Sequence, residues 1–217
     1  MPSLDVVYPI KLAGLELRYS LRCLQNVPHK KVWIVGEVPT WTKNVLTIKN
    51  RFDGTKYKKS GSNIKKVCQK EELSEDFILM NDDFYILKPI EEVKLYHKGE
   101  LELDGRNLYH AGGFRTLELL KSLGIRKPLN YEMHLPCVIN KKLKNELSAK
   151  YSHPQGYWLR TLYFNYYGLG GEYKEDVKIY HYKSKVTCDT FASSLNQSNL
   201  ELIRFPDWIA EKCRYEV

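Results

Sequence analysis

Long apolar runs are missing from this sequence of 217 residues. Continuous apolar stretches such as Val32–Val35 and Phe77–Met80 are four residues long, whereas a membrane-spanning helix needs roughly 20. We therefore expect no membrane insertion. The first residues, Met1–Asp5, also lack the basic-then-apolar order of a secretory signal, so we expect a cytoplasmic protein.

Cysteine pairs at metal-ligand spacing are missing as well. No two cysteines stand in a Cys-x-x-Cys arrangement, and none forms a tight cluster with histidine. The number of cysteines is odd, and they are spread along the chain: Cys23, Cys68, Cys137, Cys188 and Cys213. This pattern indicates reduced, mostly buried thiols and argues against a structural zinc site.

Internal repeats, linkers and low-complexity segments are absent too. With 43% hydrophobic and 28% charged residues, the composition is close to that of an average globular protein. These values exclude a disordered chain, a collagen-like repeat and a coiled coil. Because the length suits one large domain, the sequence predicts a single domain over residues 1–217.

Positive charge is in excess. The 34 Lys and Arg residues exceed the 26 Asp and Glu residues, which leaves a formal net charge of +8. Such a field favours a polyanionic partner or a phosphorylated ligand. The alternative is that pairs such as Lys58-Lys59 and Lys65-Lys66 only form a solvated face, and composition leaves both interpretations open.

The order of apolar and polar segments predicts an α/β fold. A β-branched run at Asp5–Ile10, a helix from Glu16 and an apolar run at Val32–Val35 form a strand, a helix and a strand, which predicts a parallel crossover. Further elements are expected at residues 45–48, 63–69, 77–80, 84–89, 116–123, 141–150, 154–166 and 177–182. We expect a mixed, mostly parallel sheet that is flanked by helices.

An acidic pair follows one of the buried strands. Asn81, Asp82 and Asp83 come directly after the apolar run Phe77–Met80, at what would be the carboxyl end of a strand. Ligands of open α/β sheets collect at that edge. Two carboxylates there fit a divalent cation that bridges to a diphosphate, but they fit a polar turn equally well.

Several stretches, taken together in order and spacing, resemble the Stealth family of sugar-phosphate transferases. The resemblance covers about residues 4 to 150. It is carried by Asp5–Tyr8, Glu16–Leu24, Val32–Gly36, Val38–Trp41, Asn63, Leu73–Phe84, and His134–Pro136 with Lys141 and Leu143.

The resemblance implies a nucleotide-sugar-dependent transferase with a glycosyltransferase-A-like fold. The chain departs from the family at Pro9-Ile10, where a Thr-Trp pair usually follows. Its later part, Trp158–Asn165, is more similar to small phage and bacterial glycosyltransferase-like proteins. We therefore expect transfer of a sugar to a hydroxyl acceptor, with sugar-1-phosphate transfer to a polysaccharide as the alternative.

The acidic pair and two histidines are the candidates for chemistry. The resemblance implies that Asp83 and Asp82 bind Mn²⁺ or Mg²⁺, and glycosyltransferase-A enzymes often add a ligand from their later part, for which His181 is the candidate. His134 is the candidate base, because histidine titrates near neutral pH and this one matches the family's His-x-Pro. Asp82 is its expected catalytic companion.

Five residues are expected to bind the nucleotide-sugar donor. A leaving diphosphate needs cations and hydrogen-bond donors around it. The residues expected there are Tyr8, Arg18, Asn63, Asn81 and Arg160. Each also has an ordinary structural interpretation, such as a surface ion pair for Arg18 and a turn for Asn81.

Aromatic side chains interleaved with basic ones mark the part of the chain after Tyr151. Aromatic faces stack on sugars and on unpaired bases alike, so composition does not select the acceptor. The net charge favours DNA with a hydroxymethylated base, which would have to leave the stack to react. The rival classes are a non-catalytic module that binds nucleic acid or glycan, and a metal-dependent nuclease.

Overall fold

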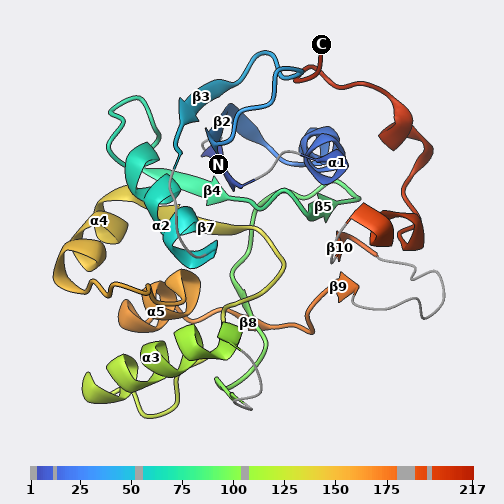
Figure 1. Ribbon diagram of the computed structural model, residues 1–217. Helices are drawn as coiled ribbons and strands as arrows, with labels where there is room; N and C mark the ends of the chain where they lie inside the picture. The colour runs from blue at the N-terminus through green and yellow to red at the C-terminus, as the bar shows by residue number, and fades with distance from the viewer. Residues whose placement is uncertain (1–3, 12–13, 52–55, 104–107, 180–188, 195–196) are drawn as a thin grey trace.

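A five-stranded sheet forms the centre of the described chain (Figure 1). The computed structural model describes residues 4–11, 14–51, 56–103, 108–179, 189–194 and 197–217. The strands are β1 (Leu4–Ile10), β2 (His29–Gly36), β3 (Leu46–Lys49), β4 (Asp76–Leu79) and β7 (Cys137–Asn140). Their order is β3-β2-β1-β4-β7. The first four run parallel and β7 runs antiparallel to β4, which confirms the predicted mixed, mostly parallel sheet.

Strand β1 is covered on both faces. Its side chains alternate between the faces, as in every strand. Val6 and Tyr8 belong to one buried apolar cluster and Val7 belongs to the other. A strand buried on both sides gains from apolar residues at every position, which explains the continuous apolar run.

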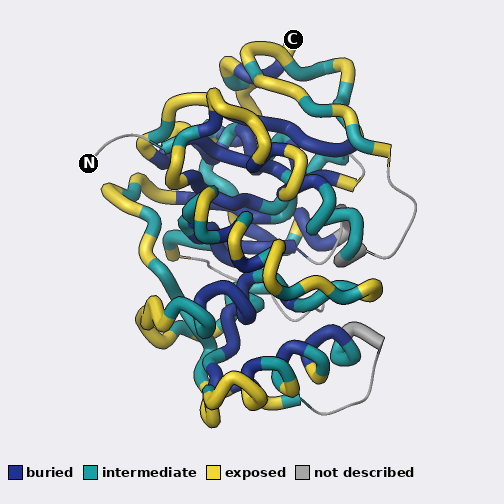
Figure 2. Tube along the Cα trace, turned by 90° about the vertical axis from the view of Figure 1, so that its left-hand side faces the viewer, coloured by how far each residue is buried: buried dark blue, intermediate teal, exposed yellow. Residues whose placement is uncertain are grey.

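Helices flank the sheet on both sides. Helix α1 (Leu15–Cys23) buries Leu17 and Leu21 in the first cluster, whereas α2 (Lys56–Val67), α4 (Lys141–Lys150) and α5 (Leu159–Tyr166) contribute to the second (Figure 1). Figure 2 shows the buried strands between helices whose outer turns are exposed. Helix α3 (Leu108–Ser122) packs against α5.

Two smaller sheets extend the fold beyond β4. Strands β5 (Phe84–Ile86), β10 (Phe191–Ser194) and β9 (Lys178–Ile179) lie in the order β5-β10-β9. Strands β6 (Tyr96–His97) and β8 (Glu172–Tyr173) pair in parallel. The 3₁₀ helices are η1 (Leu24–Asn26), η2 (Gln197–Leu202) and η3 (Asp207–Ala210).

Some predicted boundaries were wrong. Helix α2 begins at Lys56, ahead of the start predicted at residue 63, so Asn63 lies within the helix and does not open it. Helix α5 begins at Leu159, although a start at Pro154 was predicted. Of the strand expected at 177–182, β9 covers Lys178–Ile179 and the last three residues lie outside the described chain.

The carboxyl ends of β1 and β2 approach each other closely at Gly36. Its φ of 122° is a conformation that side chains rarely adopt. A Cβ atom there would lie 2.0 Å from the carbonyl oxygen of Ile10 and 2.8 Å from Nδ2 of Asn63. Only glycine at this position lets the end of β1 and the side chain of Asn63 in α2 approach the end of β2 so closely.

The described part of the chain bears on two expectations, the reduced cysteines and the lack of membrane insertion. Cys23, Cys68, Cys137 and Cys213 are free thiols, and Cys188 lies outside the described residues. No helix in the described part combines the length and apolar composition that a bilayer crossing requires.

Candidate active site

A cavity of about 1340 Å³ opens beyond the carboxyl ends of β1 and β4. Pro9 of β1, Leu79 of β4 and Asn81 beyond β4 line it, together with His134 and Arg160. The sheet order 3-2-1-4 places a switch point between β1 and β4, because the chain leaves β1 toward β2 and returns on the other side at β4. Open α/β sheets bind their ligands at such a point.

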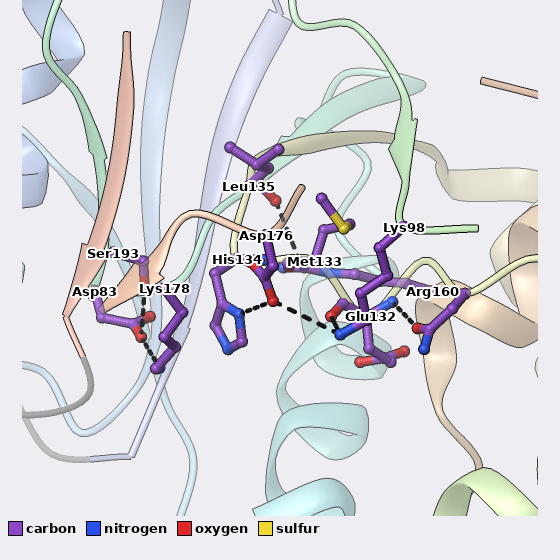
Figure 3. Close-up of polar contacts among 11 residues, drawn as sticks. Asp83, Lys98, Glu132, Met133, His134, Leu135, Arg160, Asp176, Lys178 and Ser193 are labelled. Carbon is purple, nitrogen blue, oxygen red and sulfur yellow. Dashed lines mark hydrogen bonds and ion pairs between the residues drawn. The ribbon is translucent and has the colours of Figure 1, made fainter. Parts of the chain in front are cut away.

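His134 lines this cavity and forms a hydrogen-bonded pair with Asp176 (Figure 3). Nδ1 of His134 lies 2.8 Å from Oδ2 of Asp176, and the backbone N–H of His134 donates to Oδ1 at 3.1 Å. The carboxylate therefore binds both the ring and the main chain of the same residue. This double contact fixes the position and the orientation of the imidazole.

The pair is in the charge state that a general base requires. Burial lowers the pKa of His134 below its ordinary value of 6.5, and the hydrogen bond to Asp176 opposes this only in part. Burial by itself would raise the pKa of Asp176, but hydrogen bonds from His134 and the charge of Lys98 hold it below its ordinary value. At neutral pH the carboxylate is ionised and the imidazole is neutral. Nδ1 then carries the ring proton, and Nε2 is the basic nitrogen.

Lys98 supports the same carboxylate from the other side. Its Nζ lies 3.6 Å from Oδ2 of Asp176 and donates to the carbonyl oxygen of Glu132 at 3.1 Å. Glu132 in turn accepts a hydrogen bond from the backbone N–H of Thr161 in α5. Lys98 thus links the segment that follows β6 to the loop that carries His134, and it favours the ionised form of Asp176.

Arg160 connects the loop around His134 to the end of β4. Its Nη1 donates to the carbonyl oxygens of Met133 at 2.5 Å and Leu135 at 3.2 Å, the two neighbours of His134 (Figure 3). Its Nη2 lies 3.4 Å from Oδ1 of Asn81. The residue lines the cavity as predicted for a donor contact, but these hydrogen bonds hold the loop in place.

Asp83 is engaged by a lysine in this structure. Its Oδ2 accepts hydrogen bonds from Nζ of Lys178 at 2.7 Å and from Oγ of Ser193 at 3.2 Å (Figure 3). Both charged side chains are nearly buried, with 17% of Asp83 and 8% of Lys178 exposed. The lysine neutralises the carboxylate that was expected to bind a metal.

The described residues do not fit a divalent metal site. Mg²⁺ and Mn²⁺ require several oxygen ligands around one point, whereas Asp83 shares its carboxylate with an ammonium group. Within the described chain, no group of three or more His, Cys, Asp or Glu side chains could hold an ion. His181, the expected third ligand, lies outside the described residues.

Asn81 and Asp82 lie at the turn between β4 and β5. Asn81 lines the cavity, as expected for a residue close to the donor. Asp82 is partly exposed and is not one of the described cavity-lining residues. The expectation that Asp82 assists catalysis stays a prediction.

Three of the expected donor contacts lie elsewhere. Tyr8 is fully buried in the core, and its hydroxyl lies 3.0 Å from Oγ of Ser20, so it offers no surface to a donor. Asn63 is buried and uses Nδ2 to donate to the carbonyl oxygens of Ile10 and Val35, at 3.2 and 2.9 Å. Tyr8 therefore connects β1 to α1, and Asn63 holds α2 at the ends of β1 and β2.

Arg18 is the third expected donor contact that lies elsewhere, and it binds the C-terminal segment. Its Nη1 lies 2.8 Å from Oε2 of Glu216, and its guanidinium group lies 4.0 Å from the centre of the Trp41 ring. Arg22 bonds the same carboxylate, and these hydrogen bonds outweigh burial and lower the pKa of Glu216 to about 2. Arg18 does not line the described cavity, and its assignment to the donor stays a prediction.

Sequence reasoning missed Asp176, Lys98 and Lys178. Asp176 lies 42 positions after His134, and no motif connects the two. The only local signal was the position of Asp176 just before an alternating stretch that was expected to form a strand. The two lysines were indistinguishable from the many solvated lysines of a basic chain.

Comparisons with known proteins give a distant likeness in fold. No protein-family model matches the chain, and no curated protein matches it significantly. The structure is similar to the apo-form glycosyltransferase GlyE of Streptococcus pneumoniae TIGR4, with a TM-score of 0.39 and 9% identity over 80% of this chain and 45% of that chain. It is also similar to HddC from Yersinia pseudotuberculosis, with a TM-score of 0.36 and 13% identity over 79% of this chain and 88% of that chain.

These likenesses carry no assignment of activity. Both TM-scores are low, and this chain spans less than half the length of the GlyE chain it matches. The resemblance to the Stealth family therefore stays a prediction from the sequence.

Proposed function

We propose that the protein is a nucleotide-sugar-dependent glycosyltransferase in which His134 accepts the proton of the acceptor hydroxyl. The observation that carries this proposal is that His134, which is hydrogen-bonded to Asp176, lines a large cavity at the switch point of an α/β sheet. A neutral imidazole whose orientation is fixed by a carboxylate is a well-suited general base.

The reaction exchanges one carbon–oxygen bond for another and moves one proton. The acceptor oxygen forms a bond to the anomeric carbon of the sugar, and the bond from that carbon to the diphosphate oxygen breaks. The electron pair leaves with the nucleoside diphosphate, and the hydroxyl proton moves to Nε2 of His134. Asp176 stabilises the imidazolium that results, because its ionised carboxylate lies 2.8 Å from Nδ1.

The charge around the cavity suits a diphosphate leaving group. Among the described lining residues, six carry a positive charge and two carry a carboxylate. The cationic ones are Lys58, Lys65, Lys98, Lys144, Arg160 and Lys178, and the carboxylates are Glu102 and Glu132. A positive wall stabilises the negative charge that develops on the leaving diphosphate without the help of a metal ion.

A panel of nucleotide sugars tests the proposal. The purified protein is incubated with each donor, with and without Mn²⁺, and with hydroxyl acceptors that include glycans and hydroxymethylated DNA. The proposal predicts release of a nucleoside diphosphate together with a glycosylated acceptor. Release of a nucleoside monophosphate would mean sugar-phosphate transfer, and no release from any donor would favour a module that only binds.

A further inference from the structure

Two cationic residues of the described chain, Arg160 and Lys144, are buried over the whole residue, and they differ in what they contact. Arg160, with 8% of the residue exposed, donates to two backbone carbonyl oxygens and lies close to Asn81. Lys144, with 2% exposed, has no hydrogen bond or ion pair to any residue that the structure describes. A buried ammonium without a partner is costly unless an anion compensates it.

The groups that face Lys144 supply no counter-charge. Lys144 belongs to α4 and its electrostatic neighbours are Cys68, directly after α2, and Lys65 of α2. Burial raises the pKa of the Cys68 thiol to about 11, so the thiol is neutral at physiological pH. Burial is also the main cause that lowers the pKa of Lys144, and Lys65 lowers it further.

The ammonium borders the cavity, at the end formed by α2 and α4. Lys144 and Lys65 line the same space as the hydroxyl groups of Ser60, Ser62 and Ser148. The two carboxylates that line the described cavity belong to neither helix. This end therefore offers positive charge and hydrogen-bond donors to whatever enters it.

The size of the cavity leaves room for a second ligand group. Its volume of about 1340 Å³ exceeds the roughly 300–1,000 Å³ that is usual for a small-molecule site. A ligand that reaches His134 at one end can extend, or be accompanied by another ligand, toward α2 and α4.

We propose that Lys144 and Lys65 form an anion subsite that binds a phosphate group of a ligand in the cavity. An ionised phosphate accepts charge-assisted hydrogen bonds from ammonium groups and supplies the charge that Lys144 lacks. The phosphate belongs either to a nucleoside diphosphate or to a phosphorylated acceptor. The subsite is inferred from the unpartnered lysine and stands independently of the transfer reaction.

Isothermal titration with inorganic pyrophosphate tests the subsite. The wild type should bind it, and Lys144→Met should weaken binding by at least about tenfold, the loss expected for one charge-assisted hydrogen bond. Lys142→Met is the matched control, because Lys142 lies on the same helix but is exposed, and it should bind like the wild type. Equal affinity in wild type and Lys144→Met, or no binding by the wild type, would overturn the proposal.

Thermal unfolding gives a second readout that guards against a folding defect. Methionine removes an unpaired buried charge. Without ligand, the unfolding temperature of Lys144→Met should therefore be at least as high as that of the wild type. Pyrophosphate should raise the unfolding temperature of the wild type more than that of Lys144→Met. An equal rise in both proteins would contradict the subsite.

Uridine and adenosine diphosphates distinguish the sources of the phosphate. If the wild type binds a nucleoside diphosphate more tightly than pyrophosphate, and Lys144→Met weakens this binding, the subsite belongs to the donor. If the two affinities are equal and both fall in Lys144→Met, the subsite belongs to a phosphorylated acceptor. The variant His134→Ala should keep pyrophosphate affinity, so a failure of the subsite and a failure of the proposed reaction are separable.

Discussion

The two ends of the cavity hold their buried cations in different ways. At the His134 end, Arg160 and Lys178 each contact oxygen atoms of the protein, at 2.5 to 3.4 Å. At the α2–α4 end, Lys144 contacts none among the described residues. Satisfied charges fix geometry, which a catalytic group needs, whereas an unsatisfied charge is a site for a ligand's opposite charge.

This contrast predicts where a substitution changes chemistry and where it changes structure. Loss of His134 should affect turnover, loss of Arg160 should affect both turnover and stability, and loss of Lys178 should affect mainly stability. The size of each expected effect follows from how directly the residue takes part in the reaction.

The largest effect is expected for His134→Ala. Removal of a general base should lower the rate of transfer by a factor of roughly 10²–10⁴. The measurement is the initial rate of nucleoside diphosphate release with a saturating acceptor. Circular dichroism should match the wild type, because the imidazole is not part of either buried apolar cluster. A rate within about threefold of the wild type, far less than a general base contributes, would contradict the assignment of the base.

Arg160→Met should weaken both the fold and the reaction. The substitution leaves the carbonyl oxygens of Met133 and Leu135 without their donor, so we expect a loss of about 3 kcal/mol in the free energy of unfolding. Denaturant titration measures it.

A positioning role for Arg160 predicts a particular kinetic pattern. The turnover number should fall because the loop around His134 loses its support, while the KM for the donor changes little. Arg160→Lys should recover part of the turnover number, since lysine still donates to one carbonyl oxygen. If KM alone changed, Arg160 would be a donor contact, as the sequence predicted.

Lys178→Met tests the ion pair with Asp83. It leaves a nearly buried carboxylate without its cation, and we expect a loss of about 2 kcal/mol in the free energy of unfolding, less than for a fully buried pair. Lys88→Met is the control, because the Lys88–Asp189 pair is largely exposed and should contribute almost nothing. Equal losses for both variants would show that burial does not strengthen the Asp83 pair.

Lys178→Met also tests whether Asp83 can bind the metal ion that was expected there. Since Lys178 occupies the carboxylate, Lys178→Met should bind Mn²⁺ more tightly than the wild type in a titration followed by electron paramagnetic resonance. Tighter Mn²⁺ binding by the wild type than by Lys178→Met would contradict the expectation that Lys178 competes with a metal for Asp83.

The sequence predicted the central elements of the fold because their signal is local. The apolar run Val32–Val35 became a buried part of β2, and Phe77–Leu79 became the buried part of β4. Asn81 and His134 lie at the cavity, and both had a local signal, since one follows a strand end and the other belongs to a recognisable motif.

The rest of the site depends on contacts between distant parts of the chain. Arg18 looked available for a donor, but it pairs with Glu216, which is 198 positions away. Asp83 looked available for a metal, but its partner Lys178 is 95 positions away. Nothing in the neighbourhood of these residues in the sequence distinguishes a free charge from a paired one, because the pairing follows from the tertiary fold.

The dependence of kcat/KM on pH tests the central claim most directly. His134 acts as a base only when it is deprotonated, and burial holds its pKa below 6.5. The rate should therefore rise as pH increases through a midpoint below 6.5 and then stay level. The hydrogen bond and charge of Asp176 raise the pKa of His134, so Asp176→Asn should move this midpoint to lower pH. It should also lower the plateau, because the ionised partner of the imidazolium is lost. An acid limb that is unchanged in Asp176→Asn, or that persists in His134→Ala, would contradict the account.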